Sequence, residues 1–288
     1  MASLHPNSVL LHKYSEIPPF LQGNPHIKDG YRVFLSYPMC LRSLCVLSNE
    51  FVNVWSHLVG FLLFVGLFLQ DQASVIETSG GDATDRMVIS TGLACFQICM
   101  IFSASFHLFH CHSEDACRRW LRLDLLGISV AVCGCYFTGI YYGFYCLDYF
   151  RNMYFALCSV LTLATVSFQL HPNFDTPHWF ERRLALYAAI VMFGIVPTMH
   201  WAIIYGGEAG EVQLFLPKVV IMYLLFLIGV IFYITRFPER SFPGMVDIFG
   251  SSHQWWHVFV LAALLYWHNA GLEVFAYRKT MPCVQPGG

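Results

Sequence analysis

The chain has 288 residues, of which 57% are hydrophobic, 17% aromatic and only 12% charged. Soluble domains usually carry about a quarter charged residues, so this composition excludes an ordinary soluble protein and indicates a polytopic membrane protein. The formal net charge of −2 provides no basic field of the kind that binds nucleic acid.

The first 48 residues carry turn signals rather than an apolar signal sequence. Pro18-Pro19, Asn24-Pro25 and Asp29-Gly30 fall in this stretch, which has no long run of hydrophobic residues. We therefore expect residues 1–48 to form a segment outside the membrane, and the first transmembrane helix to direct insertion.

Seven apolar runs follow, each long enough to cross a hydrocarbon core about 30 Å thick. Short polar links such as "TSGGDATD" and "GGEAGE" separate them, and Pro197 is expected to kink the fifth run. The sequence predicts an all-α integral membrane protein, a seven-transmembrane helix bundle over residues 49–278 with a short tail at 279–288. The predicted spans are 52–70, 87–109, 121–145, 153–170, 184–205, 214–235 and 254–277.

Lysine and arginine predict the orientation, because cytosolic loops carry an excess of them. Eleven lie in the N-terminal segment or in links on the same side, and four lie on the opposite side. This excess predicts a cytosolic N-terminus and a lumenal or extracellular C-terminus. The eleven are Lys13, Lys28, Arg32, Arg42, Arg118, Arg119, Arg122, Arg182, Arg183, Arg236 and Arg240; the four are Arg86, Arg151, Arg278 and Lys279.

Two familiar seven-helix classes are disfavoured. The predicted orientation is the reverse of a G-protein-coupled receptor, and no Asp-Arg-Tyr motif follows the third run. The seventh run has no lysine that could carry retinal.

Polar side chains from four spans share one predicted membrane depth, at the cytosolic ends. Ionisable residues inside spans indicate a functional site by default, and a shared depth brings them within reach of one another. The residues are Glu50, Asn53, Ser56 and His57 of the first span, Ser103 and His107 of the second, Asp124 of the third, and His253 and His257 of the seventh.

The stretch "SSHQWWH" (251–257) places His253 and His257 four residues apart, on one helix face. With His107 they make three imidazoles, which together with the carboxylate of Asp124 suit a zinc ion with an open position. Glu50, Asn53 and His57 fall on one helix stripe and are expected to support this site by hydrogen bonds.

Simpler interpretations stay open. Histidines at span ends can sit at the headgroup interface, and Trp255 and Trp256 suit an interfacial aromatic belt. His171, His200 and His268 have no matching partners in the sequence, so we leave them outside the predicted site.

Five stretches together resemble the progestin and adipoQ receptor family, over nearly the whole chain. They are "IPPFLQGNPHIKDGYR" (17–32), "SNEFVNVWSHLVG" (48–60), "SASFHLFHCH" (103–112), "LDLLGIS" (123–129) and "GSSHQWWHV" (250–258). The resemblance implies seven helices, a cytosolic N-terminus, zinc bound by His107, His253 and His257, Asp124 holding the zinc through a water molecule with Ser103 nearby, and a pocket for a lipid ligand.

Within that family, the stretches "CLRSLCVLSNE", "CRRWLRLD", "PERSFPG" and "GSSHQWWHVFV" are most similar to the Golgi-resident members that trap Raf kinase. This likeness implies a multi-pass Golgi protein, with the plasma membrane as the alternative location. It implies that residues 1–48 tether Raf kinase and damp signalling to the MAP kinases.

Two other functions remain open. A zinc hydrolase of lipid amides such as ceramide would use Asp124 and Ser103 in catalysis, although Gln254 stands where His-Glu-x-x-His enzymes keep their catalytic glutamate. Alternatively, zinc would be purely structural, with Asp124 as a fourth ligand.

Overall fold

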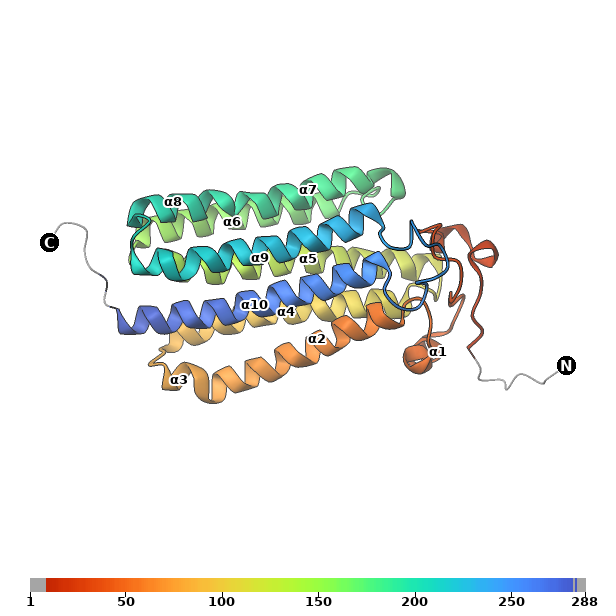
Figure 1. Cartoon of the computed structure of the whole chain (residues 1–288), viewed down its shortest axis with the longest axis horizontal. Helices are drawn as coiled ribbons and strands as arrows, with labels where there is room; N and C mark the ends of the chain where they lie inside the picture. The colour runs from red at the N-terminus through yellow and green to blue at the C-terminus, as the bar shows by residue number, and fades with distance from the viewer. Residues whose placement is uncertain (1–8, 282, 284–288) are drawn as a thin grey trace. The chain divides into compact units, whose positions relative to one another are not determined.

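The computed structural model describes residues 9–281 and 283. The regular elements among these residues are helices, and the β-structure is one isolated bridge between His12 and Tyr31. Seven helical segments are long and apolar enough to cross a membrane, which confirms the predicted all-α, seven-transmembrane class (Figure 1). They run Phe51–Thr78, Ala83–Phe109, Glu114–Gly143, Asp148–Gln169, Phe180–Tyr205, Gly210–Thr235 and Ser252–Thr280.

In Figure 1 these segments are labelled α2 (Phe51–Gln70) with α3 (Ile76–Thr78), α4 (Ala83–Phe109), α5 (Glu114–Gly143), α6 (Asp148–Gln169), α7 (Phe180–Phe193) with α8 (Ile195–Tyr205), α9 (Gly210–Thr235) and α10 (Ser252–Thr280). Residues 1–8 of the predicted N-terminal segment, and 282 and 284–288 of the predicted tail, lie outside the described residues.

The contacts divide the chain into two compact units. The first holds Met1–Gly60, Met100–Asp124 and Leu225–Leu261; the second holds Phe61–Cys99, Leu125–Leu224 and Ala262–Gly288. Each unit is therefore built from parts of several helices that are distant in the sequence.

In the first unit, the N-terminal segment is folded against the link that precedes α10. Ile17, Leu21, Ile27 and Tyr31 form a small buried cluster, and α1 (Tyr37–Arg42) follows it. The buried carboxylate of Asp247 accepts hydrogen bonds from the backbone N–H groups of Lys28 (3.1 Å) and Asp29 (2.9 Å). These bonds fasten residues 28–29 to the chain that leads into α10.

A second buried carboxylate caps the start of α10. Glu239 is 0% exposed, and its Oε2 accepts the backbone N–H of Ser252 at 2.7 Å. Its Oε1 accepts the Ser252 hydroxyl and the Asn24 side-chain amide, the latter at 3.1 Å. The first N–H groups of a helix lack partners inside the helix, and a carboxylate there stabilises its positive end.

In the second unit, the first membrane helix does not end at residue 70 as predicted. A π-helical turn, Asp71–Val75, carries it into α3. The polar residues there are partnered by α4: the Gln72 amide donates to Ser90 at 2.7 Å, and the Arg86 guanidinium donates to the Gln72 carbonyl at 2.9 Å. These partners let a polar stretch stay helical at membrane depth.

The fifth span is interrupted at Gly194, between α7 and α8, rather than at Pro197 itself. Proline at 197 has no N–H to donate four residues back, so the ladder is broken one turn earlier along the helix. At the end of α7, the carbonyl of Val191 accepts both the N–H of Gly194 at 3.2 Å and the Tyr223 hydroxyl at 2.9 Å.

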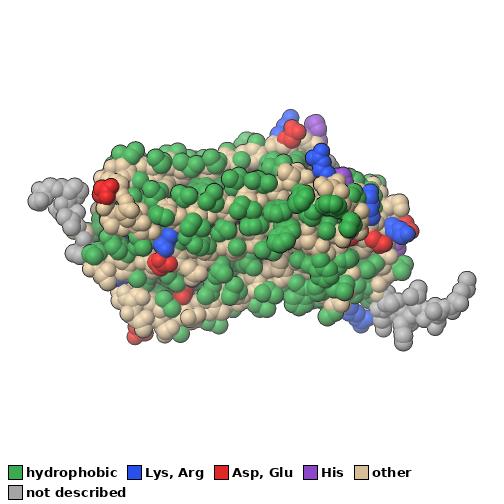
Figure 2. Space-filling view, viewed as in Figure 1, with side chains coloured by type: hydrophobic (Ala, Val, Ile, Leu, Met, Phe, Trp, Pro, Cys, Tyr) green, Lys and Arg blue, Asp and Glu red, His purple; other side chains and the backbone are tan. Residues whose placement is uncertain are grey.

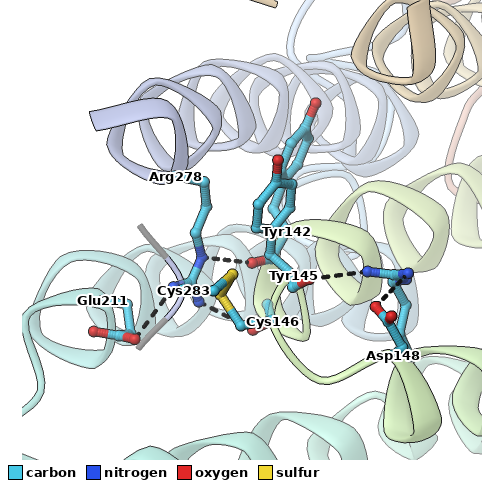
Figure 3. Close-up of a disulfide and its surroundings, with 9 residues drawn as sticks. Tyr142, Tyr145, Cys146, Asp148, Glu211, Arg278 and Cys283 are labelled. Atoms are coloured by element: carbon cyan, nitrogen blue, oxygen red, sulfur yellow. Dashed lines mark hydrogen bonds and ion pairs between the residues drawn. A yellow bond between two sulfur atoms is a disulfide. The ribbon is translucent and has the colours of Figure 1, made fainter. Parts of the chain in front are cut away.

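A disulfide joins Cys146, which follows α5, to Cys283, which follows α10 (Figure 3). Beside it, the buried Arg278 donates to the carbonyls of Tyr142 (3.1 Å) and Gly143 (3.2 Å), the last turn of α5, and pairs with Glu211 of α9 at 3.2 Å. A cation suits a helix C-terminus, whose last carbonyls lack partners in the helix.

Hydrophobic side chains cover most of the visible helical face (Figure 2). Large apolar residues such as Leu163, Ile203 and Leu227 are more than half exposed. A soluble protein rarely exposes such continuous apolar surface, whereas hydrocarbon chains solvate it.

Replacing the α10 cap, Glu239→Ala, is expected to destabilise the protein by about 1–3 kcal/mol, since three donors lose their acceptor in a buried place. The midpoint of thermal unfolding of the purified protein in nanodiscs measures this. The exposed Glu208→Ala is the matched control and should leave the midpoint unchanged. Equal midpoints for all three proteins would contradict the capping role.

Candidate metal centre

Three histidine side chains from two helices converge in the first unit. His107 ends α4, and His253 and His257 lie one turn apart at the start of α10. The Nε2 atom of His253 lies 3.2 Å from Nε2 of His107 and 3.2 Å from Nε2 of His257. Among the described residues, these three form a group whose ligand atoms all lie within 4.8 Å of one another. Such a group can hold a metal ion.

His107 is oriented by a carboxylate. Its Nδ1 lies 2.8 Å from Oε2 of Glu50, the residue before α2, so Nδ1 donates and Nε2 is left for a metal. The amide of Asn53 donates to the same carboxylate oxygen at 2.7 Å. Burial tends to raise the pKa of Glu50, but His107, His110 and the Asn53 amide together hold that pKa well below its usual range.

His257 is oriented by the backbone and a hydroxyl of α2. Its Nδ1 lies 3.2 Å from the carbonyl oxygen of Asn53 and 3.2 Å from Oγ of Ser56, which leaves Nε2 for a metal. The ring of His57 stacks on the ring of His257, with centroids 3.8 Å apart and planes 13° apart. Glu50, Asn53 and His57 thus all lie against the histidine cluster.

Asp124 and Ser103 face each other beside the cluster. The Ser103 hydroxyl donates a hydrogen bond to the half-buried Asp124 carboxylate. Asp124 is not in the group whose ligand atoms all lie within 4.8 Å of one another, which consists of the three imidazoles.

Two residues that sequence reasoning did not assign to the site hold it in place. Arg32 is buried and donates to the backbone carbonyl of His107 at 2.6 Å and to the Ser43 hydroxyl at 2.6 Å. His110 lies with Nε2 3.6 Å from Oε1 of Glu50. The burial of Arg32 has no periodic signal in the N-terminal segment; only the tertiary structure shows it.

Gln254 has a structural place. It is buried, its amide donates to the carbonyl of Ile248 at 2.9 Å, and its oxygen accepts the N–H of Gly250 at 2.6 Å. These hydrogen bonds attach the Gln254 side chain to the backbone of the link that leads into α10. Soluble metalloproteases carry their catalytic glutamate at this place in the motif, whereas Gln254 here hydrogen-bonds the backbone of Ile248 and Gly250.

His171, His200 and His268, which were left outside the predicted site, lie outside this cluster. The Tyr154 hydroxyl lies 2.9 Å from Nδ1 of His200, and His171 stacks on Trp179. Nε2 of His268 lies 3.1 Å from Asp71 Oδ2 in the second unit. No sequence spacing relates these two residues, which are almost two hundred positions apart.

The three imidazoles converge with their Nε2 atoms, and hydrogen bonds hold the Nδ1 atoms of His107 and His257. Such a set of nitrogen donors suits a catalytic or open metal site. Seven membrane helices with such a buried histidine cluster define a seven-transmembrane protein with a candidate intramembrane metal centre.

Comparison with known proteins places the chain in a family. Residues 45–268 match the family described as haemolysin-III related. The chain is 43% identical to human "Progestin and adipoQ receptor family member 3" over 97% of its own length and 91% of the human protein, with the same identity and coverage for the mouse protein. It is 30% identical to the fruit-fly "Adiponectin receptor protein" over 92% of this chain and 60% of that protein. The chain belongs to the haemolysin-III-related progestin and adipoQ receptor family.

His253→Ala is expected to lower the zinc content of the purified protein severalfold, because two imidazoles remain where three are needed. Glu50→Gln should keep the zinc but weaken its binding about 10–100-fold, since the carboxylate orients His107. Elemental analysis and competition with a chromogenic chelator measure both. The exposed His171→Ala is the control; equal zinc in all four proteins would remove the metal site.

Proposed function

We propose that this membrane protein of the progestin and adipoQ receptor family is a receptor-like Golgi protein that binds zinc at His107, His253 and His257, tethers Raf kinase and damps signalling to the MAP kinases. The observation that carries the zinc proposal is the convergence of three Nε2 atoms from α4 and α10. Neutral imidazoles in a buried place prefer Zn²⁺ to Mg²⁺ or Ca²⁺, which take oxygen ligands.

The proposed orientation has the N-terminus in the cytosol. The excess of lysine and arginine on the N-terminal side supports it. The Cys146–Cys283 disulfide supports it independently, because disulfides persist in oxidising compartments and both cysteines follow the C-terminal ends of their helices. With seven spans, those ends face the lumen or the outside.

The tether function rests on the resemblance of the sequence to the Raf-trapping members of the family and on side chains exposed in the N-terminal segment. The chain is 43% identical to member 3 over 97% of its length, which supports the resemblance. Buried residues such as Ile17 and Arg32 anchor it, whereas Phe34 and Leu41 are 65% and 52% exposed. Phe34 also has a φ of +51°, which is uncommon for a bulky residue and points to a functional position.

We expect the double variant Phe34→Ser, Leu41→Ser to lose recruitment of Raf kinase to Golgi membranes, because an exposed aromatic at the centre of an interface typically carries 2 kcal/mol or more, about thirtyfold in affinity. Imaging of Raf kinase in cells that express each protein measures recruitment. These substitutions leave the buried anchor intact, which deletion of residues 1–40 would not.

The matched control for that experiment is Leu163→Ser, an equally exposed leucine on α6. The zinc content of all proteins should stay equal, which shows that the fold is retained. Unchanged recruitment by the double variant, together with unchanged recruitment after deletion of residues 1–40, would contradict the tether.

The alternative function is a zinc-dependent, ceramidase-like hydrolase of lipid amides, favoured by one observation: a carboxylate–hydroxyl pair, Asp124 and Ser103, stands beside the histidines. Zinc, when bound, would supply a Lewis acid that polarises an amide carbonyl and acidifies a water molecule. Asp124 would accept the proton of that water and pass it to the leaving amine, and Ser103 would hold the carboxylate in place.

Asp124→Asn separates catalytic from structural zinc. If the site is catalytic, hydrolysis of a fluorescent ceramide falls about 10²–10⁴-fold while the zinc content is unchanged, since proton transfer is lost and the imidazoles remain. If Asp124 is a fourth ligand, zinc affinity falls instead. Zinc-loaded protein without any turnover, in wild type and variant alike, would exclude the hydrolase and leave the tether.

A further inference from the structure

A second pair of ionisable side chains is buried in the second unit. Asp71 opens the π-helical turn after α2, and His268 lies within α10. Oδ2 of Asp71 lies 3.1 Å from Nε2 of His268, and the two residues are 1% and 7% exposed. Both lie within membrane-spanning segments. Ionisable groups in such places are costly and are retained where they bind or move something.

The pair is close but poorly aligned. Neither Oδ2 of Asp71 nor Nε2 of His268 makes a properly directed hydrogen bond to any group in the described part of the chain. A buried carboxylate beside a neutral imidazole leaves a net negative charge in a low dielectric, and one added proton cancels it. Binding one proton therefore stabilises this buried pair.

A cavity of about 10 Å³ adjoins His268. Thr138 and Tyr142 of α5 and Trp267 of α10 are among the residues that line it. A space of this size holds about one water molecule, which needs two to four polar partners. The imidazole and the two hydroxyl groups are polar groups on this cavity, and Ile89, Leu93, Phe96 and Leu272 form its apolar walls, so His268 and Tyr142 border one space the size of a water molecule.

From Tyr142, polar contacts continue to an exposed residue. The Tyr142 hydroxyl donates to Oδ1 of Asp85 at 3.3 Å. Lys279 Nζ lies 2.5 Å from Asp85 and 3.1 Å from Asp82. The side chain of Asp85 is 0% exposed and that of Asp82 is 59% exposed. The contacts thus form a continuous polar route from the surface to the cavity.

We propose that Asp71 and His268 form an intramembrane proton-binding site that exchanges its proton through Tyr142, Asp85 and Lys279. The bound state is a carboxylate–imidazolium pair, and the released state is a carboxylate beside a neutral imidazole. Proton uptake forms an N–H bond on the His268 imidazole and proton release breaks it; no other covalent bond changes. This site uses no residue of the histidine cluster, so it stands whether or not zinc binds there.

The other titratable and charged groups around the site do not replace the imidazole. Imidazole is the side chain that ordinarily exchanges protons between pH 5 and 8, and His268 is the one beside Asp71. Tyr142 of α5 lines the cavity beside His268, and Arg86 of α4 binds the carbonyl of Gln72, next to Asp71. Asp85 of α4 and Arg278 of α10 contact Tyr142, and Lys279 of α10 contacts Asp85.

The test of binding compares thermal unfolding midpoints from pH 5 to 8 for wild type and Asp71→Asn, full length and in nanodiscs. Only wild type can pair an imidazolium with a carboxylate at this place, so its stability advantage over Asp71→Asn should be largest at pH 5 and should shrink as the pH rises towards 8. His268→Gln should lose the same pH-dependent advantage. The control is Asp148→Asn, a carboxylate whose side chain is 78% exposed.

If Asp71→Asn alone does not fold, the double variant Asp71→Asn, His268→Gln removes both charges and keeps two polar side chains. The double variant should fold, and the unfolding midpoint of wild type should rise relative to that of the double variant as the pH falls. A wild-type advantage that is constant from pH 5 to 8, over the single or the double variant, would overturn the proposal.

The route is tested by a stopped-flow pH jump followed by tryptophan fluorescence. The component that Asp71→Asn abolishes should relax more slowly in Tyr142→Phe, which keeps the ring packed on Phe275 and removes the hydroxyl. Tyr154→Phe is the control, since it removes a hydroxyl bonded to His200 instead. Equal relaxation rates in all proteins would exclude the route through Tyr142.

Discussion

Hydrocarbon offers no hydrogen-bond partners, so each polar side chain in a membrane helix must find one within the protein. This constraint organises the first unit, where Glu50 receives Nδ1 of His107 and the Asn53 carbonyl receives Nδ1 of His257. Two imidazoles are thereby turned with Nε2 inward. The metal-binding geometry is a consequence of how α2 satisfies the second nitrogens, and the Glu50 carboxylate supplies the charge that a divalent cation favours nearby.

Segments outside the spans hold the ends of the two helices that carry the ligands. Arg32 binds the carbonyl of His107 near the end of α4, and Glu239 binds the first N–H group of α10, that of Ser252. Asp247 fastens the N-terminal segment to the link before α10. The N-terminal segment, where the tether is proposed, thus contacts the helix end that carries His107.

The seven spans and the residues of the histidine cluster could be predicted, because hydrophobic length and helical spacing are local properties. The ends of the spans could not be predicted: residues 71–75, with polar Asp71, Gln72 and Ser74, stay helical where α4 supplies partners to Gln72. The pairing of Asp71 with His268 was missed for the same reason, since no spacing along the chain connects them. The Cys146–Cys283 disulfide likewise joins residues 137 apart in the sequence.

By itself, the sequence determined the class of protein, the number of spans and the residues able to bind a metal. Composition, run length and the four-residue interval in "SSHQWWH" depend only on which residues follow one another. The tertiary structure decided which nitrogen of His107 and His257 faces the cluster and which backbone groups Gln254 binds. It also decided that Asp71 lies beside His268. Those outcomes depend on side chains from separate helices competing for the same few partners, and such competition is settled by packing in three dimensions.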